Sequence, residues 1–230
     1  MPHSLLRRSL TKIGYYKRGV PWYGFMLRVS IDTLSKLGMR IEPFDLFLEG
    51  LGRCQPPVRP ASCDGASIEF LGLEAMAELT TMPGRDFSQA DLGARLRSGQ
   101  LCLGVKHHGK IVAFTWCNLT ECRIEKLGLF DLQADEASLF DAYTTMEYRG
   151  RDLAPWMRYR CYEEMAKLGR QRCYSVTIIF NTPANRFKQK LGATVIGKGL
   201  YIELLGRIRF HMGANPVRAA TYRGRQNEGA

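Results

Sequence analysis

Residues 149–154 have the residue types and spacing of an anion-binding turn. Their order is Arg149-Gly150-Arg151-Asp152-Leu153-Ala154, and a helical pattern of apolar residues follows directly. The first N–H groups of a helix have no partner within the helix and lie at the positive end of its dipole, and a glycine lets a ligand approach the backbone. The two arginines add charge that suits phosphate groups. An ordinary basic strand-to-helix turn has the same pattern, so the loop alone does not decide between the two.

A single acid, Asp141, interrupts the otherwise uncharged run 138–145. A carboxylate within such a strand is costly unless it is paired or used. A carboxylate in such a place could act as a general base, so Asp141 is our first candidate for that role, followed by Glu125 and Tyr143. The alternative is that Asp141 faces a helix start or a basic partner.

The elements that would position these residues alternate between strands and helices. In chain order the patterns predict a strand, two helices, a hairpin, a strand, a long helix, a strand, a short helix and a closing ribbon. The ranges are 67–71, 73–80, 88–97, 101–106 with 110–117, 138–145, 153–168, 174–180, 183–190, and 194–196 with 200–205. Such an order predicts an α/β domain with a mixed sheet.

Three regions are expected along the chain. Residues 1–65 form a basic and aromatic N-terminal extension with a helix over 25–37, a short extended segment over 42–51 and a proline-rich linker from 54. Residues 66–212 form the α/β domain, and residues 213–230 form a basic tail that we expect to be disordered. Residues 1–40 could contact an anionic membrane surface or another subunit, including a second copy of the chain.

The net charge is unevenly distributed. The chain has 33 Lys and Arg residues against 22 Asp and Glu, a formal charge of +11 over 230 residues. The whole excess lies in residues 1–40 and 207–230, whereas residues 41–206 carry 20 charges of each sign. Within that neutral body, residues 149–198 hold 11 basic and 3 acidic residues, so the positive part contains the anion-binding turn. Apolar (45%) and charged (24%) fractions exclude a disordered or collagen-like chain.

The cysteines and histidines do not indicate a metal site. Seven cysteines are an odd number, and none has Cys-x-x-Cys spacing, so we expect reduced, mostly buried thiols in a cytoplasmic protein. His107 and His108 precede Gly109 in the predicted hairpin turn without a third ligand nearby. No run of about 18 apolar residues is present, so no membrane-spanning helix is expected.

The order of elements and two short motifs resemble the GNAT acyltransferases, which move an acyl group from coenzyme A to an amine. Family members carry an Arg/Gln-x-x-Gly-x-Gly/Ala loop after the fourth strand, which here reads Arg149-x-x-Asp152-x-Ala154. They also carry an Asn after the fifth strand, an Ala three residues on, and then Leu-Gly-aromatic. The matching residues are Asn181, Ala184, Leu191, Gly192 and Ala193. The resemblance covers about residues 66–205.

This resemblance implies a fold and a set of cofactor contacts. The fold is α/β, with a mixed, mostly antiparallel central sheet of about six or seven strands, splayed between the fourth and fifth strands, and helices on both faces. The pyrophosphate of acetyl-CoA would rest on the backbone of the loop Arg149, Gly150, Arg151, Asp152, Leu153 and Ala154. The pantetheine arm would pair with the backbone of Ala142, Tyr143 and Thr144, and Asn181 would contact the cofactor at the splay. A backbone N–H near Thr144 would stabilise the oxyanion.

Two positions depart from the family pattern. Asp152 replaces a glycine and places a carboxylate beside the expected pyrophosphate, where it either repels the phosphates or caps the helix. Many members have a Tyr seven residues after the Asn, which protonates the departing thiolate, and this position is Lys188 here. Lys188 could protonate the thiolate or bind a phosphate, and a thiolate can also leave without a dedicated acid.

The sequence therefore predicts a cytoplasmic, acyl-CoA-dependent N-acyltransferase that uses acetyl-CoA and no metal. Its acceptor would be a small-molecule amine, bound near the hairpin 101–117 and the two helices before it. The acid-rich segment 41–148 favours a cationic or amino-bearing acceptor. One alternative is a non-catalytic protein of the same fold that binds acyl-CoA as a regulator. Nucleic-acid binding through the basic ends is a weaker alternative, because no recognised motif accompanies the charge.

Overall fold

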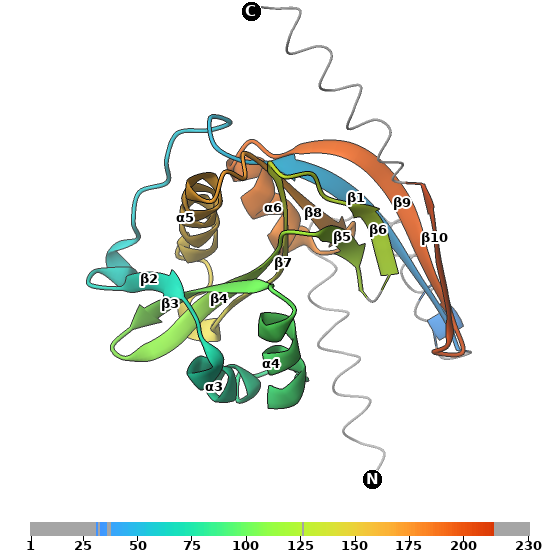
Figure 1. Ribbon diagram of the computed structural model, residues 1–230, viewed down its shortest axis with the longest axis horizontal. Coiled ribbons are helices and arrows are strands. Elements are labelled where there is room, and N and C mark those ends of the chain that lie inside the picture. Colours follow the sequence, from blue (N-terminus) through green and yellow to red (C-terminus); the bar gives the residue numbers. More distant parts are fainter. Residues whose placement is uncertain (1–30, 32, 36–37, 126, 214–230) are drawn as a thin grey trace, which may run out of the picture. The chain divides into compact units, whose positions relative to one another are not determined.

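A computed structural model describes residues 31, 33–35, 38–125 and 127–213 (Figure 1). The strands are β1 Met39–Glu49, β2 Ser67–Phe70, β3 Leu101–His107, β4 Lys110–Asn118, β5 Glu121–Ile124, β6 Leu127–Asp131, β7 Glu136–Thr144, β8 Arg172–Ile178, β9 Thr194–Leu204 and β10 Ile208–Gly213. The helices are α3 Met76–Thr80, α4 Gln89–Arg97, α5 Leu153–Lys167 and α6 Thr182–Lys190, with one-turn 3₁₀ helices at Ala61–Cys63, Leu73–Ala75 and Met146–Tyr148.

The described residues form two compact units. The larger unit contains residues 43–199, and the smaller unit contains the described residues up to 42 together with 200–212. In the larger unit the strands lie in the order β9, β1, β8, β7, β4, β3 and β2. In the smaller unit β10 lies beside β9, and β9 lies beside β1. The functional residues predicted from the sequence all belong to the larger unit.

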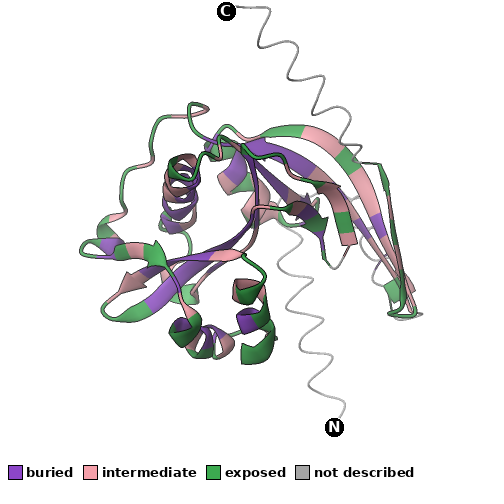
Figure 2. Cartoon of the chain, viewed as in Figure 1, coloured by how far each residue is buried: buried purple, intermediate pink, exposed green. Residues whose placement is uncertain are grey.

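The sheet of the larger unit is mixed and mostly antiparallel, as predicted. β2, β3, β4 and β7 pair antiparallel in sequence, β8 pairs antiparallel with β1, and β7 with β8 is a parallel pair. The central strand β4 is buried from its second residue onward, whereas the edge strand β2 is largely exposed (Figure 2). The separate hairpin of β5 and β6 packs near the parallel pair, where the ring of Phe130 lies edge-on to Tyr174 at 5.3 Å.

Helices cover both faces of this sheet. On one face, α3 and α4 bury Met76, Leu79 and Leu92 against Phe114 and Trp116 of β4. On the other face, α5 packs its long apolar stripe against β4, β7 and β8 through side chains that include Tyr159, Cys161, Tyr162 and Met165. The α4 helix begins as its sequence predicts, because Ser88 and Asp91 form a reciprocal capping box. Six of the seven cysteines are buried, which also matches the sequence-based expectation.

Two assignments made from the sequence differ from the structure. The segment 42–51, placed in the extension before residue 65, belongs to strand β1, whose residues Phe44 to Glu49 pair with β8. The ribbon predicted over 194–196 and 200–205 is one continuous strand, β9, and the strand beside it is β10. The hairpin of β5 and β6 was not predicted at all.

The ends of the chain lie largely outside the described residues. Of the helix predicted over 25–37, Ile31 and residues 33–35 are described, and they are helical. Residues 1–30 and 214–230 are not described, so the roles suggested for the basic ends stay predictions. Within the described part, none of the helices combines the length and apolar character needed to cross a membrane.

We expect Phe44→Ala to lower the free energy of unfolding by about 3–5 kcal/mol, because removal of a fully buried ring leaves a cavity. Phe44 is 1% exposed in β1, although the sequence placed it in an extension. Urea denaturation measures the change, and Val58→Ala in the exposed linker is the control, since Val58 is 88% exposed. Equal stability of the two variants would show that β1 is not an integral strand.

Candidate functional site

The parallel strands β7 and β8 pair only at their first residues. The paired positions are Glu136 with Arg172, Ala137 with Cys173 and Ser138 with Tyr174. Beyond the last pair, β7 continues to Thr144 and β8 to Ile178. We call this part of the sheet the β7–β8 separation. The β7 backbone there has no strand partner on its β8 side among the described residues, which leaves it able to accept an extended ligand.

A bulge lies in β7 within the same region. The register with β4 runs from Trp116↔Phe140 to Phe114↔Tyr143, so Asp141 and Ala142 together face the single residue Thr115. Asp141 has a positive φ of 51°. A bulge bends its strand and changes the alternation of side chains. As a result Phe140, Asp141 and Tyr143 all contact the aromatic side chains or arginines on the α4 face.

The loop between β7 and α5 presents a helix start next to the separation. Gly150 (φ 73°) and Asp152 (φ 56°) both adopt left-handed backbone, and α5 begins at Leu153. The Asp152 side chain makes no capping hydrogen bond to α5. The third helical residue, Pro155, has no N–H, so Leu153 and Ala154 carry the first helical N–H groups. The loop therefore leads into a helix start, as the sequence predicts, and its binding of an anion stays a prediction.

Charged side chains surround this loop. Asp152 forms an ion pair with Lys190 of α6 at 2.6 Å, and both side chains are more than half exposed. Arg149 is exposed, donates from Nε to the carbonyl oxygen of Thr144 at 2.9 Å, and lies over the ring of Tyr143 at 5.5 Å. The carboxylate of Asp152 is therefore directed to a lysine rather than to the helix start.

Asn181 follows strand β8 by three residues and directly precedes helix α6. Its Oδ1 accepts a hydrogen bond from the N–H of Ala184 at 3.3 Å, which makes it the N-cap of that helix. The sequence had suggested a cofactor contact for this residue, and the structure adds a local reason for an Asn at this position.

The four residues suggested for proton transfer lie in different environments. Asp141 is paired through both carboxylate oxygens, to Arg85 at 2.8 Å and to Arg95 at 2.7 Å. The Tyr143 hydroxyl donates to the carbonyl oxygen of Pro83 at 3.0 Å. Glu125 lies in the exposed turn between β5 and β6. The structure thus brings Asp141 and Tyr143 together at the bulge, and places Glu125 on a separate hairpin.

Lys188 lies in the core. It is 2% exposed, and its Nζ donates to Ser175 at 2.6 Å and to Thr177 and lies 3.7 Å from Glu49. The carboxylate of Glu49 also accepts from Ser175 and from the Tyr162 hydroxyl at 2.6 Å, and Arg158 lies 3.7 Å away. We call this set the Glu49 cluster; its charged members are Glu49, Arg158 and Lys188. It joins β1, β8, α5 and α6 in the interior.

Burial and the neighbouring charges act in opposite directions on the protonation of Glu49 and Lys188. Loss of solvent lowers the pKa of Lys188 from 10.5 to about 8, although Glu49 acts in the opposite direction. Loss of solvent also opposes ionisation of Glu49, but Arg158, Lys188 and the hydrogen bonds from Ser175 and Tyr162 lower its pKa overall. Nε and Nη1 of Arg158 are buried without a hydrogen-bond partner. The ion pair with Glu49 at 3.7 Å is what offsets the burial of this guanidinium charge.

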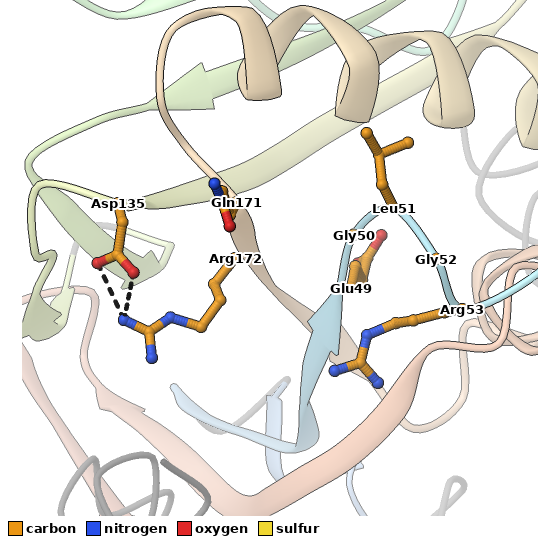
Figure 3. A pocket seen from close by; sticks show the side chains of 8 residues that line it. All are labelled: Glu49, Gly50, Leu51, Gly52, Arg53, Asp135, Gln171 and Arg172. Carbon is orange, nitrogen blue, oxygen red and sulfur yellow. Dashed lines mark hydrogen bonds and ion pairs between the residues drawn. The ribbon is translucent and has the colours of Figure 1, made fainter. Parts of the chain in front are cut away.

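A polar cavity of about 460 Å³ lies elsewhere in the larger unit (Figure 3). It is lined by Glu49 to Arg53, Asp135, Gln171 and Arg172, and the Asp135 carboxylate is bidentate with Arg172. These residues lie at the start of β8, whereas the separation lies toward its end. The cavity is therefore distinct from the region that the sequence motifs indicate. In the described part of the chain, no group of three His, Cys, Asp or Glu residues could hold a metal ion.

Arg85 and Arg95 are the site residues that sequence reasoning missed. Arg85 precedes α4 and Arg95 lies in its last turn, 56 and 46 residues before Asp141, and neither belongs to a motif. The signal that could have found them is the lone acid in an uncharged strand, which requires cations from another element. Lys190 was missed for a similar reason, because its partner Asp152 belongs to a different loop.

Comparisons with known proteins indicate the fold. No family model matches the sequence, and a search of curated proteins found no match. Among solved structures, a Drosophila protein from a structural genomics consortium aligns with a TM-score of 0.55 and 15% identity, over 80% of this chain and 59% of that one. A GNAT-family acetyltransferase from Colwellia psychrerythraea aligns with a TM-score of 0.54 and 16% identity, over 72% of this chain and 57% of that one. A GCN5-related N-acetyltransferase from Kribbella flavida aligns with a TM-score of 0.51 and 13% identity, over 74% of this chain and 62% of that one. The chain thus spans less than two thirds of each.

Lys188→Met should remove a pH dependence from the stability of the protein. The folded-state pKa of Lys188, about 8, lies below its ordinary value of 10.5, so the folded state is penalised where the amine is charged. Its contribution to the free energy of unfolding therefore rises between pH 8 and 10.5, by about 3 kcal/mol in total. Urea denaturation at pH 7.5 and at pH 10 measures the difference in the free energy of unfolding between the wild type and the variant. Groups that titrate equally in both proteins cancel in this difference. A constant difference would contradict a buried, neutralised lysine.

Proposed function

Because this chain has the fold of the GNAT acyltransferases, we propose that it transfers an acyl group, most simply acetyl, from coenzyme A to the amine of a small molecule. The observation that carries the proposal is the β7–β8 separation, which adjoins the helix start at residues 149–154. An uncovered strand edge beside an anion-binding turn suits a ligand with an extended amide chain and a pyrophosphate.

The residues around the separation fit coenzyme A in charge and in hydrogen bonding. The N–H groups of Leu153 and Ala154, with the exposed Arg149 and Arg151, would hold the pyrophosphate. The backbone of Ala142, Tyr143 and Thr144 would pair with the pantetheine arm. The carbonyl oxygens of Ala142 and Thr144 already accept from Arg85 and Arg149, but a carbonyl oxygen has two lone pairs and can accept again.

The chemistry is direct attack of the amine on the thioester. Acetyl-CoA would supply the acyl group in an activated form. The N–H of Thr144 would stabilise the negative charge on the carbonyl oxygen, and such a donor typically contributes about 10²–10³ in rate. The C–N bond forms, the C–S bond breaks with its electron pair on sulfur, and coenzyme A leaves as the thiolate. The amine proton passes to water, and the released thiolate takes up a proton from water. We assign no proton transfer to Lys188, because its ammonium is enclosed by Ser175, Thr177 and Glu49.

A second function is favoured by specific residues. Asp152 brings a carboxylate to the phosphate loop, and the buried Lys188 occupies the position where many relatives carry a tyrosine acid. Both features suit a protein that binds acyl-CoA as a regulator without turnover. We rank this function below transfer, because direct attack does not require the tyrosine.

Release of coenzyme A separates the two functions. We expect purified protein, mixed with acetyl-CoA and a panel of polyamines, amino acids and amino sugars, to release thiol and to form one acetylated amine, both followed by mass spectrometry. If acetyl-CoA stabilises the protein against heat but no amine causes release of the thiol, the transferase proposal fails and the binding function is supported. Arg151→Gln should weaken the stabilisation by removing a phosphate-pairing charge, whereas Lys110→Gln, at the exposed hairpin turn, is the control.

Asp152→Gly and Asp152→Asn should both tighten binding of coenzyme A, by about threefold to fivefold at low salt. Both residues accept the left-handed backbone at position 152, so the loop should keep its shape while it loses a negative charge. The loss also frees the Lys190 ammonium for the phosphates. Isothermal titration measures the affinity, and added salt should reduce the gain. Weaker binding in both variants would show that the Asp152–Lys190 pair itself supports the site.

A further inference from the structure

The bulge in β7 is a strained feature that must be held by its surroundings. Asp141 has a φ of 51°, a left-handed conformation that is costly for a residue with a Cβ atom. The neighbouring pairs Trp116↔Phe140 and Phe114↔Tyr143 are in register, so the irregularity is confined to Asp141 and Ala142. Such a local departure persists only where other contacts determine it.

Two arginines supply those contacts. Nη1 of Arg85 pairs with Oδ1 of Asp141 at 2.8 Å, and Nη1 of Arg95 pairs with Oδ2 at 2.7 Å. Nη2 of Arg85 also donates to the carbonyl oxygen of Ala142 at 3.1 Å. One guanidinium thus binds both residues of the bulge, the side chain of the first and the backbone of the second.

Aromatic rings fix the two guanidinium groups in turn. Arg85 lies over Tyr143 at 5.0 Å and over Phe87 at 5.5 Å, and Arg95 lies over Phe87 at 4.9 Å and over Trp116 at 5.1 Å. The three charged side chains are 22%, 26% and 13% exposed for Arg85, Arg95 and Asp141, respectively. Partial burial among rings makes such pairs stronger than ion pairs on an open surface.

The hydrogen bond from Arg85 acts on the peptide through which β7 returns to register. The peptide group is planar, so fixing the carbonyl of Ala142 also fixes the N–H of Tyr143 on the opposite side. Tyr143 is the first residue after the bulge that again pairs with β4, opposite Phe114. The direction of the following N–H, that of Thr144, depends on this return.

We propose that Arg85 and Arg95 are positioning residues that act through Asp141 to hold the bulge of β7, and so aim the Thr144 N–H at the thioester carbonyl. This inference rests on the proposed transferase function. It gives Asp141 a role different from the general base suggested by the sequence. Each oxygen of Asp141 is directed to a guanidinium group, so we assign this carboxylate to the support of the bulge.

Substitution of Asp141 by two small residues separates these roles. Glycine adopts a positive φ without strain, so Asp141→Gly should keep the bulge without the arginines and retain kcat within about fivefold. Asp141→Ala retains a Cβ but loses both ion pairs, so the strained bulge should relax and kcat should fall by about 30-fold or more. A fall of this size approaches the effect of removing one oxyanion donor. Equal, severe losses in both variants would overturn the proposal in favour of a base.

Substitution of Arg85 tests the peptide contact. Arg85→Lys keeps the charge but cannot bind Asp141 and Ala142 together, so kcat and kcat/KM for acetyl-CoA should fall equally, with KM unchanged. A merely structural role would reduce the folded fraction and leave kcat of the folded enzyme intact. Arg97→Lys, at the exposed end of α4, is the control. An unchanged kcat in folded Arg85→Lys would overturn the proposal.

Amide hydrogen exchange of the free protein distinguishes failure of this proposal from failure of the proposed function. Peptides covering residues 139–145 should exchange faster in Arg85→Lys and Asp141→Ala than in the wild type, and peptides of α5 should not. This result requires no substrate. If wild type transfers no acyl group but the exchange differs, the function fails and the support of the bulge stands. Unchanged exchange would overturn that support even in an active enzyme.

Discussion

The end of the parallel ladder between β7 and β8 is the constraint on which the site depends. After Ser138↔Tyr174 the two strands no longer share hydrogen bonds, although β7 continues for six residues through the centre of the larger unit. Backbone groups in such a place must find partners in side chains, water or a ligand. Arg85 and Arg149 each meet one carbonyl group there, and both guanidinium groups also lie over the ring of Tyr143. The edge that a ligand would use is thus shaped by an arginine that precedes α4 and by an arginine that follows β7.

The Glu49 cluster connects β8 to its neighbouring strand and helices through buried polar contacts. The carboxylate belongs to Glu49 of β1. Three side chains from other elements contact it: Ser175 from β8, Tyr162 from α5 and Lys188 from α6. Buried ion pairs contribute little net stability, but the loss of one partner is costly because the others stay buried. The cluster therefore specifies how these four elements pack more than it stabilises them. It also gives the end of β1 a polar anchor that a purely apolar strand would lack.

Local signals in the sequence predicted the elements that carry strong patterns. The capping box at Ser88, the apolar stripe of α5 and the β3–β4 hairpin are fixed by neighbours in the chain, and so they were found together with the loop 149–154. β1 was recognised as an extended segment but was placed in the extension because the proline-rich linker 54–65 separates it from the α/β pattern. Only pairing with β8, about 130 residues later, makes it a strand of the sheet. Arg85 and Arg95 were missed because nothing near them in the sequence indicates an acid in β7. Long-range partners of charged residues are what pattern reasoning lacks.

The two departures from the GNAT motifs that the sequence resembles have the same physical form. Each introduces a charge at a position that the family pattern leaves uncharged, and each charge meets an opposite one from a different element. Asp152 pairs with Lys190 at the surface, and Lys188 pairs with Glu49 in the core. In both cases the backbone also suits the new residue, since Asp tolerates the left-handed turn and Lys188 lies within a regular helix. Reverting either residue alone would strand its partner, without cost at the exposed Lys190 and with a large cost at the buried Glu49. The core position is therefore coupled to its surroundings, whereas the loop position can change with little effect on its partner.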